Sequence, residues 1–159
     1  MIIDVMFFEL RGRRCALPVT AVSEVVAMAN MTPVPLAPPA VRGIAPLHGQ
    51  VVPVIDLGVW LSPSPEASAA APLYRPGSDK VLLLEAPIGA EGTAPVRAAL
   101  AVDRVMRLGS IDESHARPPP SGPAFVSATV LDVEGPALLI DASKAVEQVR
   151  DAIRAAVRP

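Results

Sequence analysis

Short apolar segments separated by turn-forming residues recur along the chain. Most are rich in valine, leucine or isoleucine and end at glycine, proline or a charged residue. Such segments predict β-strands, because β-branched residues fit a pleated sheet while glycine and proline interrupt it. The predicted strands are 5–10, 14–19, 41–47, 51–57, 81–85, 96–102, 105–108, 125–133 and 137–140, with a helical turn leading into a further strand within 19–28.

The last segment has helical spacing instead. Within 142–157, valines and an isoleucine fall three or four positions apart, which predicts an amphipathic helix. Asp141 or Ser143 is expected to cap its N-terminus. Stretches rich in proline, glycine or small residues predict loops at 31–39, 62–79, 88–95 and 117–123.

The two halves of the chain echo each other. Residues 16–22 align with 99–105 at an offset of 83, and Ile55-Asp56 aligns with Ile140-Asp141 at an offset of 85. Two matches at nearly the same offset indicate two similar β subdomains. Closely spaced strands without long helices between them fit small antiparallel barrels better than a parallel α/β sheet.

Composition narrows the classes of function. The net charge is −2 without a basic block, which argues against binding nucleic acid through its phosphates. A single cysteine excludes an internal disulfide and favours a reducing compartment. No signal peptide is recognised, and no apolar run approaches the roughly 20 residues of a membrane span, so we expect a cytoplasmic protein without membrane insertion.

Candidate catalytic groups are few. His48 and His115 have no second ligand at metal-binding spacing, and no phosphate-binding loop is present, so no metal or cofactor is expected. Cys15 could meet His48 in space as a nucleophile pair, but it alternates inside an apolar strand, as a buried structural cysteine does. Asp56 and Asp141 each end an apolar strand, where turn or helix capping is favoured over acid–base chemistry.

The hairpin over 41–57 is the most distinctive motif. Two apolar strands meet at the tight turn His48-Gly49-Gln50. Upstream, Glu24 interrupts the apolar stretch 22–26. A solvated face is one interpretation of that pattern, and a carboxylate rimmed by valines at the edge of a protein interface is the other.

Several segments together resemble the CheW-like domains of bacterial chemosensory systems. The matching segments are Val22-Ser23-Glu24-Val25, Gly43-Ile44-Ala45-Pro46-Leu47-His48-Gly49, Val52-Pro53-Val54-Ile55-Asp56-Leu57-Gly58, Leu100-Ala101-Val102-Asp103-Arg104-Val105 and Ala137-Leu138-Leu139-Ile140-Asp141. The resemblance spans about residues 5–150.

The resemblance implies a mainly β fold. Two small SH3-like five-stranded β-barrel subdomains would share a hydrophobic core, with a C-terminal helix added. Residues 1–159 would form a single CheW-like domain, with subdomain one at about 15–80 and subdomain two at about 81–140. The N-terminal strand and helix 142–157 would pack across them.

The implied function is that of a non-catalytic adaptor in signal transduction. Such proteins couple chemoreceptors to a CheA-type histidine kinase in a two-component system. One surface binds the kinase regulatory domain, and a valine-rich groove between the subdomains takes the tip of the receptor's cytoplasmic hairpin. The protein would be cytoplasmic and recruited to receptor arrays. The residues expected to bind protein partners are Val22, Glu24, Val26, Gly43, His48, Val102 and Val105.

Three positions depart from the family pattern. Pro46 replaces an asparagine, His48 replaces the arginine of the turn, and Gly58 replaces the arginine after Asp-Leu. Losing the turn arginine removes a fixed charge and a five-donor fork. Two alternatives therefore stay open: a diverged CheW-like recruiter that binds another protein without bridging receptor and kinase, and an unrecognised enzyme that uses Cys15 or His48.

Overall fold

The computed structural model describes residues 1–28, 30–61, 80–86, 94–119 and 121–157. The loops predicted at 62–79 and across most of 88–95 lie outside these residues. The elements, in chain order, are β1 (Ile2–Leu10), β2 (Arg13–Pro18), the 3₁₀ turn η1 (Val19–Ala21), β3 (Val22–Ala27), β4 (Val41–Leu47), β5 (Gln50–Ile55), the short helix α1 (Gly58–Leu61), β6 (Lys80–Ala86), β7 (Val96–Ala101), β8 (Arg104–Asp112), the 3₁₀ turn η2 (Glu113–His115), β9 (Val126–Asp132), β10 (Gly135–Ile140) and α3 (Ala142–Val157).

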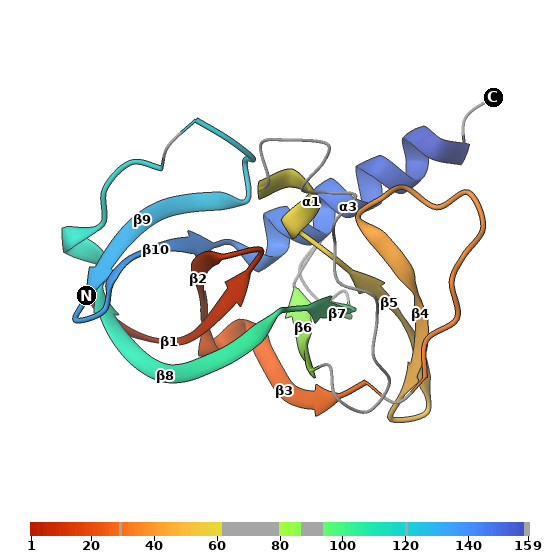
Figure 1. The fold of residues 1–159 in the computed structure, drawn as a ribbon, viewed down its shortest axis with the longest axis horizontal. Coiled ribbons are helices and arrows are strands. Elements are labelled where there is room, and N and C mark those ends of the chain that lie inside the picture. The colour runs from red at the N-terminus through yellow and green to blue at the C-terminus, as the bar shows by residue number, and fades with distance from the viewer. Residues whose placement is uncertain (29, 62–79, 87–93, 120, 158–159) are drawn as a thin grey trace.

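The described strands form two five-stranded sheets that lie side by side (Figure 1). Sheet A has the order β8-β1-β2-β10-β9, and sheet B has the order β3-β6-β7-β5-β4. Neighbouring strands are antiparallel except for one parallel pair in each sheet, β2 with β10 and β5 with β7. The expected mainly β fold with a C-terminal helix is confirmed.

The repeat predicted from the sequence is a repeat of topology. Along each sheet, in the orders given above, the successive pairs are antiparallel, antiparallel, parallel and antiparallel, so β8, β1, β2, β10 and β9 occupy the positions of β3, β6, β7, β5 and β4. In sheet A, Ala16 lies opposite Leu139, and in sheet B, Ala99 lies opposite Val54. Ala16 and Ala99 differ by 83 positions and Val54 and Leu139 by 85, which are the two offsets of the sequence echo.

The expected division of the chain near residue 80 does not match the sheets. β6 and β7, assigned to the second subdomain, pair with β3 and β5 in sheet B. β2, assigned to the first subdomain, pairs with β1 and β10 in sheet A. The chain therefore starts in sheet A, builds all of sheet B and returns. The physical reason is that β6 is buried on both faces: Leu82 and Leu84 pack in the cluster shared by the two sheets, and Val81 packs in the core enclosed by sheet B.

Side-chain alternation along the strands builds three apolar clusters. In β2, Ala16 points into a core enclosed by sheet A, while Cys15 and Leu17 join a larger cluster shared by both sheets. In β7, Ala99 points into the core of sheet B, while Leu100 joins the shared cluster. The predicted shared hydrophobic core is therefore confirmed.

Helix α3 closes one side of the shared core. The backbone N–H of Lys144 donates to Asp141 Oδ1 at 3.1 Å, so Asp141 is the N-cap of the two candidates. Val146 and Val149 are buried in the shared cluster. The apolar stripe continues past the sheets, because Ile153 and Val157 are exposed where the helix projects from the body (Figure 1).

A buried carboxylate links the two sheets. Asp56, at the end of β5, accepts from Arg11 Nη2 at 2.8 Å and from Arg42 Nη2 at 2.5 Å. Asp56 also accepts from the backbone N–H of Gly58 at 2.9 Å, which confirms its predicted role as a turn acceptor. A Cβ on Gly58 would lie 2.7 Å from Arg11 Nε, so the missing side chain makes room for the arginine that crosses from sheet A.

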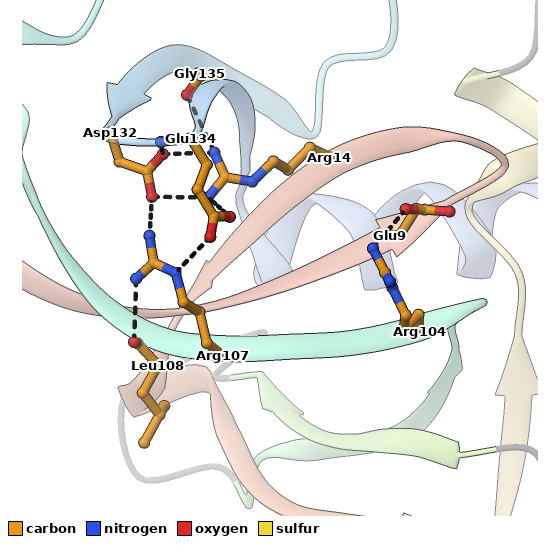
Figure 2. A network of polar contacts seen from close by, with 8 residues as sticks. All are labelled: Glu9, Arg14, Arg104, Arg107, Leu108, Asp132, Glu134 and Gly135. Atoms are coloured by element: carbon orange, nitrogen blue, oxygen red, sulfur yellow. Dashed lines mark hydrogen bonds and ion pairs between the residues drawn. The ribbon is translucent and has the colours of Figure 1, made fainter.

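An ion-pair network in sheet A joins two arginines to two acidic residues (Figure 2), and both arginines lie over the ring of Phe7. The guanidinium carbons of Arg14 and Arg107 lie 4.4 and 4.7 Å from the ring centroid. Asp132 binds both arginines, at 2.6 Å from Asp132 Oδ1 to Arg14 Nη1, and Glu134 binds them from the same turn. The hydrogen bond from Arg14 is the main reason that the pKa of Asp132 falls to about 2.

Replacing Asp132 by asparagine is expected to lower the free energy of unfolding by about 1 to 2 kcal/mol at pH 7, because the two arginines lose the negative charge and one of the two accepting oxygens. A carboxylate with a lowered pKa stabilises the folded state above its ordinary pKa near 4. The difference between wild type and Asp132→Asn should therefore shrink as the pH falls from about 4 towards 2.

Urea unfolding at several pH values measures this effect. The matched control is Glu134→Gln, which removes the half-exposed acid of the same network and should change stability by less than about 0.5 kcal/mol. A wild-type advantage that stays constant down to pH 2 would contradict the assignment.

Candidate protein-binding groove

A groove of about 520 Å³ runs between the two sheets. One wall is β3, an edge strand of sheet B, and the other is formed by β8, an edge strand of sheet A, with its neighbour β1 (Figure 1). An edge strand has a backbone side that its own sheet leaves unpaired, so this is a natural place for another chain to bind. The lining residues are Asp4, Met6, Val19, Val22, Ser23, Glu24, Val25, Leu108, Gly109 and Ser110.

The middle of the groove is apolar. Met6 and Val22 both pack partly against the shared core, so they are held by the same contacts that join the sheets. At the walls, Leu108 is 64% exposed and Val25 is 37% exposed. Exposed apolar side chains gathered in a hollow are typical of a protein interaction site.

Each wall also carries one acidic residue. On the sheet A side, the Ser110 hydroxyl donates to Asp4 Oδ1 at 2.8 Å. On the sheet B side, Glu24 Oε2 lies 2.6 Å from Nε2 of His48. The structure thus brings together Glu24 and His48, two of the residues predicted to bind partners, from separate elements.

The turn between β4 and β5 places His48 beside Glu24. His48 and Gly49 both have positive φ, 50° and 76°, which suits a tight hairpin turn. His48 does not line the groove itself. Its imidazole is 57% exposed and reaches the Glu24 carboxylate from outside the groove.

Gly43 supports the β4–β5 hairpin from within. A Cβ there would lie only 2.4 Å from the carbonyl oxygen of Thr32. Next to it, Ile44 and Thr32 exchange backbone hydrogen bonds of 2.8 and 2.9 Å. Glycine at position 43 therefore lets the chain's own preceding segment approach closely.

The predicted valines do not form one surface. Val22 lines the groove, whereas Val26 packs against the core of sheet B. Val102 is buried in the shared core, and Val105 packs partly against the same core. Among the described lining residues, valines come from η1 and β3, and β8 contributes Leu108, Gly109 and Ser110.

Several groove residues were missed by the sequence analysis. The predicted strand ended at Leu108, because Gly109 and Ser110 are typical of turns, but β8 continues to Asp112. A Cβ on Gly109 would lie 2.8 Å from the Phe7 ring, so this glycine permits close packing inside a strand. Asp4 was missed because it precedes the apolar segment from which the first strand was predicted.

The residues considered for catalysis lie in different environments. Cys15 is fully buried, and burial raises the pKa of its thiol to about 12, whereas His48 is exposed at a turn. Over the part of the chain that the structure describes, no three histidine, cysteine or acidic side chains gather as a metal site. None of the described helices is long and apolar enough to span a membrane.

Comparison with known proteins gives a family and a fold. The family model described as a CheW-like domain matches residues 4–150. The crystal structure of the scaffolding protein TtCheW from Thermoanaerobacter tengcongensis is similar, with a TM-score of 0.67 and 25% sequence identity. That match covers 88% of this chain and 84% of the other. No curated protein matches.

Thiol labelling tests the alternative that Cys15 is a nucleophile. A pKa of about 12 in place of 9.0 leaves about a thousandfold less thiolate at neutral pH, and burial also blocks the reagent. The folded chain should therefore react much more slowly than the chain in urea, with Cys15→Ser as the unlabelled control. Rapid stoichiometric labelling of the folded chain would favour the enzyme hypothesis.

Proposed function

Because the chain belongs to the CheW-like family, we propose that it couples chemoreceptors to a CheA-type histidine kinase as a non-catalytic adaptor. The family match over residues 4–150 is the observation that carries the proposal. The family match supports an adaptor role in chemotaxis. The identity of the two partners, a receptor and a kinase, is what we propose in addition. The fold supplies two kinds of surface for them, a groove between the sheets and an exposed hairpin.

The groove suits the tip of a receptor's cytoplasmic hairpin. An amphipathic helix binds best where its apolar stripe meets an apolar hollow with polar edges. Met6 and Val22 supply the hollow, and Asp4 and Glu24 supply polar edges on opposite walls. The receptor would contact both sheets at once, so its binding would depend on how the sheets are held together.

The β4–β5 hairpin suits the kinase regulatory domain. Ile44 lies opposite Pro53, and Pro46 lies opposite Val51, on one face of the hairpin. Ile44 and Val51 are 38% and 67% exposed. Pro46 lies in β4, the edge strand of sheet B, and offers no backbone donor, which disfavours uncontrolled strand pairing at that edge while the side chains of the face stay available for a specific partner.

The structure gives reasons for two of the three departures from the family pattern. His48 contacts Glu24, so the turn retains a polar link to β3. The space at Gly58 is filled by Arg11, whose guanidinium binds Asp56. Both arrangements favour a working adaptor over the diverged recruiter. Pro46 lies on the exposed hairpin face, where it would alter contacts with the kinase.

Reversing the charge of Glu24 tests the site. Glu24→Arg should fold normally, because the side chain is 46% exposed, and should bind the receptor hairpin at least about tenfold more weakly than wild type. Calorimetric titration with the receptor hairpin, and separately with the kinase regulatory domain, measures both affinities. Glu147→Arg, on the exposed face of α3, is the matched control.

The outcomes separate the hypotheses. Wild-type binding to both partners supports coupling, and binding to only one supports the recruiter. Binding to neither by a folded chain would contradict the proposal. If Glu24→Arg bound every partner as wild type does, the assignment of Glu24 to the binding site would be wrong.

A further inference from the structure

We propose that the groove selects a receptor helix that carries an arginine or lysine beside its apolar anchors, and that Asp4 and Glu24 hold this basic side chain from opposite walls. The inference rests on the proposed function, because it takes the occupant of the groove to be a receptor helix. It adds the chemistry by which the groove would choose among such helices.

The charge of the groove is one-sided. Of the described residues that line it, Asp4 and Glu24 are acidic and none is basic. The two acids belong to different sheets, one to β1 and the other to β3. A basic side chain entering the groove would meet negative charge from both walls, whereas an acidic one would be repelled from both.

Asp4 has no neutralising partner in the described part of the chain. Its hydrogen bond comes from the uncharged hydroxyl of Ser110, which lies opposite it on β8. That bond fixes the carboxylate at the wall and leaves its charge in place. Because Asp4 is exposed, a charged group of a partner can reach it without displacing an ion pair.

Glu24 keeps its charge available in a different way. One oxygen, Oε2, contacts His48 Nε2, while the carboxylate as a whole is 46% exposed. The contact with His48 orients the carboxylate through one oxygen, and the exposed remainder of the side chain is open to a partner.

The apolar groove determines what else the occupant needs. A helix about 10 Å across that rests on Met6 and Val22 would place residues three or four positions apart along the same face. A long basic side chain on that face can lay its methylene stem along apolar residues and extend its charge to the wall. Arginine, with five donors, is suited to binding two carboxylates at once.

Neutral substitutions that preserve shape test the proposal. Asp4→Asn and Glu24→Gln, singly and together, are titrated calorimetrically with the receptor hairpin at low and at physiological salt. Each single variant should weaken binding about threefold to tenfold, and the double variant should lose most of the wild-type salt dependence. The kinase regulatory domain should bind Asp4→Asn with wild-type affinity, and Glu147→Gln should behave as wild type with both partners.

Substitutions in the receptor identify the basic residue. Each arginine and lysine of the hairpin tip is replaced by glutamine, and one replacement should weaken wild type but have little further effect on the double variant. If the double variant binds the hairpin with wild-type affinity and salt dependence, the selection proposed here is wrong while coupling stands. If the wild-type chain does not bind the hairpin, the proposed function itself fails and this inference fails with it.

Discussion

The buried carboxylate of Asp56 sets how the two sheets lie against each other. The shared apolar cluster supplies most of the contact between them, but apolar burial is non-directional and tolerates small rotations. Asp56 adds direction, because a buried charge must meet its partners, and these come from the β1–β2 turn through Arg11 and from β4 through Arg42. The groove between β3 and β8 depends on that arrangement, since each wall belongs to a different sheet.

Local pattern was sufficient to predict most of the strands and the C-terminal helix, but not which strands pair with one another. Alternation and turn residues predicted the strands, because each strand can be recognised from its own residues. The offsets of 83 and 85 predicted the repeat, because short segments can be compared directly along the sequence. The distribution of the strands between sheet A and sheet B was not predictable in this way. Strand propensity does not select the neighbours of a strand, and β6 and β7 lie beside β3 and β5 only in the assembled sheet B.

The candidate site was predicted in part for the same reason. Glu24 and the His48 turn were identified, but their contact depends on how the hairpin lies beside β3. A valine inside a strand looks the same in sequence whether it faces a groove or a core, so Val102 and Val105 were assigned to the surface although Val102 is buried in the shared core and Val105 packs partly against it. Asp4 and Ser110 meet only through the pairing of β1 with β8.

The account depends on one chain contacting two partners at once, the receptor at the groove and the kinase at the hairpin. The most direct measurement mixes the purified chain, a receptor cytoplasmic hairpin and the kinase regulatory domain, and determines the mass of the complex by size-exclusion chromatography with light scattering. A complex that contains all three, and that does not form when the chain is left out, is the predicted result. Separate binary complexes that compete for the chain would contradict the account.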